Sequence, residues 1–207
     1  MSLLGVVDYG VGNMQSVANA LNKIDVPWKV VTEPSHLRVH RRLLLPGVGA
    51  FGPAMELLGK TGLREGILLA AESGVPVLGI CLGMQLLGLS SAENPSTSGL
   101  GLLDARTVAL ENGQNFTNTG FRKVAISETA GNAEFPTFDR DYYFNHGYHL
   151  VPGNSDVVVG SIDWYGSRVV AAVSHETVSG VQFHPEKSQG QGLSLLYQFA
   201  VSGELRL

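Results

Sequence analysis

The chain has 207 residues, 44% of them hydrophobic and 15% charged, which is the length and composition of one compact globular domain. Its net charge of -4 excludes the general basic surface that nucleic acid or an anionic membrane requires, so small molecules and proteins are the expected partners. Residues 1–5 lack the features of a signal peptide, and no apolar run approaches the ~20 residues of a membrane span. We therefore expect a cytoplasmic protein with a single domain over residues 1–207.

The first half of the chain alternates short apolar runs with helical patterns, as a parallel sheet covered by helices does. The expected elements are strands over Leu3–Val7, Trp28–Val31 and Leu43–Leu45, and helices over Ser16–Ile24, Ala54–Leu58 and Leu63–Ser73. The glycine-rich turn over residues 8–13 lacks the third glycine of a dinucleotide fingerprint and the lysine of a phosphate-binding loop. We therefore expect no cofactor.

The segment from His36 to Arg42 is the one dense basic stretch of the sequence. Such runs are usually solvated faces, and binding of an anionic ligand is the alternative interpretation. The turn from Pro46 to Pro53 also has two interpretations. Its closely spaced glycines allow a backbone N–H to face a ligand, as an oxyanion site requires, but they also suit a simple tight turn into the next helix.

Cys81 is the only cysteine, so an internal disulfide framework is excluded. It lies where a short apolar strand turns into an apolar helix, between Gly79 and Gly83. A nucleophile elbow needs such small residues because neighbouring segments approach closely. The start of a helix favours the thiolate, which is the attacking species. A buried structural cysteine is the alternative, and the two glycines favour the nucleophile without identifying a reaction.

The second half begins with a polar surface loop from Asn94 to Gly101 and then shows shorter strand patterns. We expect strands over Arg106–Leu110, Lys123–Ile126, Tyr142–Asn145, Val157–Ile162 and Val169–Ser174, and a last helix over Gly192–Val201. These strands should extend the same sheet in a mixed or antiparallel manner. The expected fold is thus α/β, with three layers, a mostly parallel central sheet flanked by helices, and an antiparallel extension.

A strand that ends near Val181 leads to His184, and Glu186 follows two positions later. An imidazole can take and return a thiol proton near neutral pH, and a carboxylate can hold the ring in one tautomer. The pair could also belong to a metal site, but zinc needs three or four protein ligands and no matching cluster lies nearby, so we expect no metal. His146 and His149 are expected in a pocket or on the surface rather than as ligands.

Three motifs, in this order along the chain, resemble those of the class I (triad) glutamine amidotransferases: Pro46–Gly49, Gly79–Gln85 and Phe183–Glu186. The resemblance covers nearly the whole chain. Residues 8–13 with Ser16, and residues 45–52, more specifically resemble the glutaminase subunits of imidazole glycerol phosphate synthases, which act in histidine biosynthesis. This resemblance implies a flavodoxin-like fold and hydrolysis of glutamine to glutamate and ammonia. It also implies a heterodimer in which ammonia passes through a channel to a (β/α)8-barrel synthase subunit.

The resemblance implies a role for individual residues. Cys81 would be the nucleophile that forms a thiol ester, His184 the general acid and base, and Glu186 the carboxylate that orients the ring. The backbone N–H groups of Val48 and Leu82 would form the oxyanion hole. The positions that line the glutamine pocket of the family, with the last three holding the amino-acid end of the substrate, are Gly49, Gly52, Gln85, His146, Gly147 and Tyr148.

The sequence departs from these glutaminase subunits at two places. Residues 117–122 are Thr-Asn-Thr-Gly-Phe-Arg where the family has Pro-His-x-Gly-Trp-Asn near the partner surface, and Gly147 replaces the serine of a His-Ser-Tyr stretch. Neither change touches the triad. Related subunits serve synthases of bacterial surface-polysaccharide sugars, which is the alternative function. A non-catalytic binding module that keeps the fold is a third hypothesis.

Overall fold

The structure is a computed structural model that describes residues 4–111, 117–127, 140–205 and 207. Its main sheet has nine strands, and one half of this sheet is parallel. The parallel strands, in spatial order, are β2 (Trp28–Val31), β1 (Leu4–Val7), β3 (Arg42–Gly47), β4 (Val77–Cys81) and β12 (Val178–Val181). Because helices cover both faces, these strands are nearly continuous apolar runs, and the leucines at 43–45 are fully buried.

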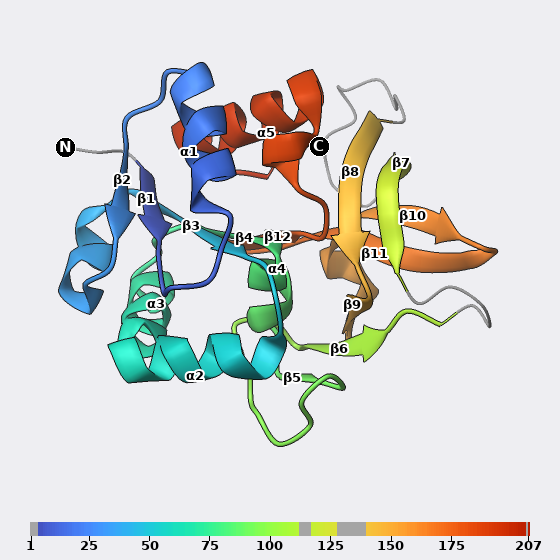
Figure 1. The fold of residues 1–207 in the computed structure, drawn as a ribbon, viewed down its shortest axis with the longest axis horizontal. Coiled ribbons are helices and arrows are strands. Elements are labelled where there is room, and N and C mark those ends of the chain that lie inside the picture. The colour runs from blue at the N-terminus through green and yellow to red at the C-terminus, as the bar shows by residue number, and fades with distance from the viewer. Residues whose placement is uncertain (1–3, 112–116, 128–139, 206) are drawn as a thin grey trace.

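The other half of the main sheet is antiparallel and continues from β12. Its strands, again in spatial order, are β11 (Ser167–His175), β10 (Val158–Trp164), β7 (Asn118–Ile126) and β8 (Arg140–His146). Figure 1 shows this half extending away from the helices. The predicted antiparallel extension is confirmed.

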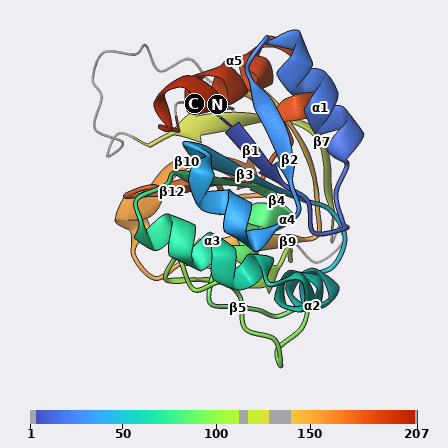
Figure 2. The ribbon, with the colours of Figure 1, turned by 90° about the vertical axis from the view of Figure 1, so that its left-hand side faces the viewer.

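The helices lie on both faces of the parallel half, as Figures 1 and 2 show. One face carries α1 (Met14–Lys23) and α5 (Gln189–Ser202), and the other carries α2 (Phe51–Thr61), α3 (Leu63–Glu72) and the short α4 (Leu82–Leu86). Two buried apolar clusters match these faces, since Val17 of α1 and Phe199 of α5 belong to one, and Leu58 of α2 and Ile67 of α3 to the other. The predicted three-layer α/β fold is therefore confirmed.

A separate sheet of three strands was not predicted. It consists of β5 (Ser90–Ser91), β6 (Ala105–Ala109) and β9 (Tyr148–Pro152). The expectation that the strand over Arg106–Leu110 extends the main sheet was wrong, because β6 pairs with β9, with Ala109 opposite Tyr148. The chain passes from β8 into β9 at Gly147, whose carbonyl accepts a hydrogen bond from the N–H of Leu110.

Three short 3-10 helices complete the described elements: η1 (Pro34–Val39), η2 (Ser155–Val157) and η3 (Pro185–Lys187). The basic stretch falls partly on η1. Leu37 is fully buried there, and the guanidinium of Arg42 donates to the carbonyl of Val201 near the end of α5, while Arg38 and Arg41 are exposed. The stretch is thus only partly a solvated face.

Most predicted elements are present with longer bounds, and Leu3 of the first predicted strand lies outside the described residues. The loop over Asn94–Gly101 contains neither helix nor strand, as predicted. In the part of the chain that the structure describes, no helix has both the length and the apolar character needed to cross a membrane.

Candidate active site

Cys81 occupies a strained turn between β4 and α4. Its φ of 53° and ψ of -109° lie outside the regions that L-residues ordinarily adopt. The flanking glycines are required by close contacts: a Cβ on Gly83 would lie 1.9 Å from the carbonyl oxygen of Leu45, and one on Gly79 would lie 2.6 Å from the backbone of Gly83. The predicted elbow geometry is therefore present. However, α4 has only five residues, so the helix dipole can contribute less at the sulfur than the sequence suggested.

The register of three parallel strands brings distant segments to the sulfur. Gly47 of β3 pairs with Cys81 of β4, which places the Val48 turn beside the start of α4. On the other side of β4, Val181 of β12 pairs with Ile80, so the next residue, Gln182, lies beside Cys81. Because the carboxyl ends of these strands meet at one edge, the chain after β12 delivers His184 to the same place.

His184 and Glu186 form a buried pair at this edge. Nδ1 of His184 and Oε1 of Glu186 are 2.8 Å apart, and the two side chains are 4% and 2% exposed. Burial lowers the pKa of His184, but its interactions with Cys81 and Glu186 outweigh this effect and raise the pKa to about 9. At neutral pH the ring is therefore an imidazolium that lies between the carboxylate of Glu186 and the sulfur of Cys81.

The edge strand β8 closes over this group. The N–H of His184 donates to the carbonyl of Tyr143, and the N–H of Tyr143 donates to Oγ of Ser188. Cys81 Sγ lies 3.9 Å from the carbonyl oxygen of Asn145, to which a thiol can donate weakly. These contacts hold the segment that carries His184 against the end of the antiparallel half.

Gln85, His146 and Tyr148 also meet next to Cys81. The carbonyl of Tyr148 accepts hydrogen bonds from Nε2 of Gln85 at 3.0 Å and from Nδ1 of His146 at 2.8 Å. Burial, together with the nearby imidazoles of His149 and His184, lowers the pKa of His146 to about 4 against the opposing effect of its hydrogen bond to Tyr148, so the ring is neutral. The structure thus brings together three of the residues assigned to the glutamine pocket by resemblance, with Gly147 between the last two.

Gly49 and Gly52 lie at the start of α2. Gly49 has a φ of 98°, which favours glycine, and a Cβ on Gly52 would collide with the side chain of Asn94. The N–H of Phe51 donates to the carboxylate of Glu93 at 2.8 Å. A residue from the loop after β5 therefore caps α2. Glu93 was not predicted at this site, because only the fold brings its loop to this helix.

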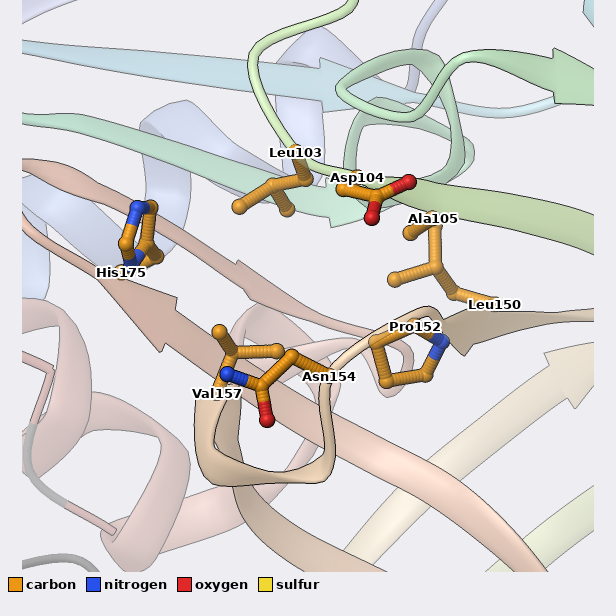
Figure 3. A pocket seen from close by; sticks show the side chains of 8 residues that line it. All are labelled: Leu103, Asp104, Ala105, Leu150, Pro152, Asn154, Val157 and His175. Atoms are coloured by element: carbon orange, nitrogen blue, oxygen red, sulfur yellow. The ribbon is translucent and has the colours of Figure 1, made fainter.

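Two hollows among the described residues are further candidate sites, and only one of them includes a member of the group formed by Cys81, His184 and Glu186. A cavity of about 110 Å³, lined largely by apolar residues of β6, β9 and the loop after β9 (Figure 3), includes His175 of β11. His175 pairs with Val178 at the start of β12, which is the opposite edge of the sheet from Cys81. A polar hollow of about 360 Å³ between α1 and α5 includes Glu186 and Lys187 and therefore adjoins the candidate site.

Among the described residues, no group of three or more His, Cys, Asp or Glu side chains is placed to hold a metal ion. The fold and the site together define an α/β protein that carries a thiol on a strand-to-helix elbow, beside a buried histidine–carboxylate pair. This arrangement suits nucleophilic attack on a carbonyl group, with proton transfer by the imidazole.

Comparison with known proteins identifies the family. The family model for "Glutamine amidotransferase class-I" matches residues 5–202, and the chain belongs to this family of glutamine amidotransferases. Two solved structures share the fold. One is a glutamine amidotransferase with a TM-score of 0.74 and 18% identity, and the match covers 96% of this chain and 98% of that one. The other is PurLQS from Thermotoga maritima, with a TM-score of 0.74 and 22% identity over 97% of this chain and 98% of that one.

Closer relatives share much more of the sequence. The chain is 40% identical to the imidazole glycerol phosphate synthase subunit HisH of Geobacillus thermodenitrificans, over 96% of this chain and 95% of the relative. It is 41% identical to the HisH subunit of Methanothermobacter thermautotrophicus, over 95% and 97% of the two chains, and 40% identical to that of Bacillus subtilis, over 95% of each.

Proposed function

We propose that this chain is the glutaminase subunit of an imidazole glycerol phosphate synthase and that it works in the cytoplasm. The observation that carries the chemistry is the meeting of Cys81, on its strained elbow, with the buried pair of His184 and Glu186. The relatives named HisH, at about 40% identity over nearly the whole chain, support the pathway.

The proposed reaction begins with attack of the Cys81 thiolate on the side-chain carbonyl carbon of glutamine. His184, as an imidazolium, gives its proton to the leaving nitrogen, so ammonia departs and a thiol ester remains. Water then attacks the thiol ester and gives a proton back to His184, which releases glutamate and restores the thiolate. Glu186 accepts from Nδ1 of the ring throughout, which leaves the other ring nitrogen to carry the transferred proton.

The oxyanion of each tetrahedral intermediate would be stabilised by the backbone N–H groups of Val48 and Leu82. The register of Gly47 with Cys81 supports this assignment, since it places these two peptides next to the nucleophile. Glycines on both sides let the Val48 peptide turn, so the donor can be presented or withdrawn. Loss of one such donor costs ~2.7 to 4 kcal/mol of transition-state stabilisation.

Substrate recognition would use Gln85, Gly49 and Gly52, with the segment from His146 to Tyr148 holding the amino-acid end of glutamine. Both hydrogens of the Gln85 amide are already donated, to Tyr148 and to Gln182, so its oxygen is the group left for a substrate N–H. The carbonyl of Tyr148 similarly accepts two hydrogen bonds that fix its direction.

The partner would be a (β/α)8-barrel synthase subunit bound in a heterodimer, with ammonia passing to it through a channel. An exposed group next to His184 supports a contact surface here. Phe121, which is 43% exposed, packs edge-on against Tyr143, and Lys187 lies over the same ring at 5.7 Å. Aromatic side chains such as those of Phe121 and Tyr143 are enriched at protein interfaces.

The test combines Cys81→Ala with the purified synthase partner. We expect loss of glutamine-dependent synthase activity while activity with ammonium salts is kept, because only the first needs a thiol ester. Glutamine hydrolysis by the Ala variant at the wild-type rate would refute the nucleophile. Rescue of a histidine auxotroph that lacks its own subunit tests the pathway separately, and failure to rescue, by a chain that hydrolyses glutamine, would refute only the pathway.

A further inference from the structure

Gln182 contacts the nucleophile, although none of the family motifs assigned it a role. Its side chain is fully buried, and its Nε2 lies 3.7 Å from Sγ of Cys81. Its Oε1 accepts from Nε2 of Gln85 at 3.2 Å. Because a buried amide is costly unless its polar atoms are partnered, the neighbours of Gln182 determine what it can do.

The orientation of this amide follows from its partners. The carbonyl of Tyr148 can only accept, so the Gln85 atom that faces it must be the amide nitrogen. The same nitrogen faces Gln182, which must therefore present its oxygen to Gln85. Gln182 is left with its N–H₂ group on the side of the sulfur, and a flipped amide would place two donors against each other.

A second set of contacts fixes the Tyr148 carbonyl from the other side. Arg122 cannot accept a hydrogen bond, so the Asn118 atom that its Nε meets at 3.1 Å is the amide oxygen. Asn118 then donates through Nδ2 to Nε2 of His146 at 3.0 Å, and His146 donates through Nδ1 to the carbonyl of Tyr148. Every side chain in this series of hydrogen bonds, from Arg122 to Gln85, therefore has one consistent orientation.

We propose that Gln182 is a catalytic residue whose amide N–H donates a hydrogen bond to the sulfur of Cys81 and stabilises the thiolate. This inference rests on the proposed function, in which that sulfur attacks glutamine and is later released from the thiol ester. A donor favours the charged form of its acceptor. Since α4 has only five residues, a side-chain donor can supply stabilisation that the helix terminus cannot. The thiol proton passes to His184, and Gln182 keeps its own protons.

The test is the pH dependence of Cys81 alkylation by iodoacetamide, in the full chain without partner or glutamine. Gln182→Met keeps the length of the side chain and removes the donor. A hydrogen bond to a charged group can favour the thiolate over the thiol about ten- to hundredfold. Without this donor, we expect alkylation at neutral pH to be slower by about the same factor, and the midpoint of its pH profile to lie about 1 to 2 pH units higher. Gln191→Met, at an exposed position on α5, is the matched control and should react like the wild type.

An unchanged alkylation midpoint in a folded Gln182→Met chain would overturn the proposal. A second measurement needs no variant: the side-chain amide signal of Gln182 in a ¹⁵N NMR spectrum of the wild type. We expect its protons to shift as the thiolate forms and to lose this titration once Cys81 is alkylated, whereas an amide with a purely structural role would not follow the thiolate. Neither measurement involves glutamine hydrolysis, so failure of the proposed function would leave both results interpretable.

Discussion

Replacement of Glu186 by Gln tests the electrostatics of the site directly. The variant keeps the shape of the side chain and an acceptor for Nδ1 of His184, but it removes the buried negative charge. Because the interactions with Cys81 and Glu186 raise the pKa of His184 to about 9 against the effect of burial, loss of one of them should lower it. An opposite charge in direct contact predicts a fall of at least about one pH unit.

The same change predicts a pH-dependent effect on stability. The pKa of His184 is raised above its unfolded value of 6.5, so its contribution to the free energy of unfolding is complete below pH 6.5 and is lost as the pH rises through about 9. At about 1.36 kcal/mol per pH unit, this contribution reaches ~3 kcal/mol. In Glu186→Gln the loss between pH 6.5 and 9 should be smaller and should finish at lower pH.

Urea unfolding of the isolated chain at pH values from 6 to 10, with ¹³C NMR of the labelled imidazole, measures both quantities. Comparison of the pH dependence, rather than of absolute stability, avoids the separate cost of burying an amide in place of a carboxylate. Cys81→Ser removes the other interaction that raises the pKa and should lower it independently. Titration of His184 at or below 6.5 in the wild type, or identical pH slopes in the wild type and Glu186→Gln, would refute this account.

Three further substitutions test the packing at the elbow, the hydrogen bonds of Asn118 and the proposed partner surface. Gly83→Ala should destabilise the fold by ~3 kcal/mol or more in thermal unfolding, because its Cβ would meet a β3 carbonyl. The control, Gly59→Ala on α2, has open space and should stabilise the fold by ~0.5 to 1 kcal/mol. Equal effects of the two substitutions would contradict the elbow contacts. Asn118→Leu leaves Nε2 of the buried His146 ring without its partner and should cost ~1 to 3 kcal/mol in urea unfolding; an unchanged stability would show that this contact contributes nothing. Phe121→Ala should weaken binding of the synthase partner at least about tenfold in calorimetry while Tyr197→Ala, on α5, does not; unchanged affinity would exclude that surface.

The sequence was sufficient for features that depend on local spacing. Gly79, Cys81 and Gly83 predict the elbow because a turn of that kind excludes side chains at those positions, and the structure shows the close contacts responsible. Predicted strands were too short where flanking polar or proline residues continued the pairing. Pro46 lies within β3, and it is tolerated because the pairing of β3 with β1 ends at Leu44, before the missing N–H would matter.

Features that depend on long-range pairing could not be predicted. The alternation of residues in β6 suits either sheet, and only its pairing with β9, about forty residues later, places it in the smaller one. The cap that Glu93 provides for α2 and the orientation of the His146 ring depend on the same kind of contact. In each case, the residue type is compatible with several environments, and the fold selects one of them.

The register of β3, β4 and β12 explains why these residues can act on one sulfur atom. Gly47 on one side of Cys81 directs the turn proposed to form the oxyanion hole, and the β12 residues on the other side bring Gln182 beside the sulfur and His184 just beyond it. A slip of one residue would turn every β12 side chain to the opposite face, so the register has to be held firmly. Tight packing provides this constraint, because a Cβ on Gly180 would lie 2.6 Å from Met84 of α4. The glycines of β4 and β12 therefore contribute to the chemistry by fixing the register, although they carry no reactive group.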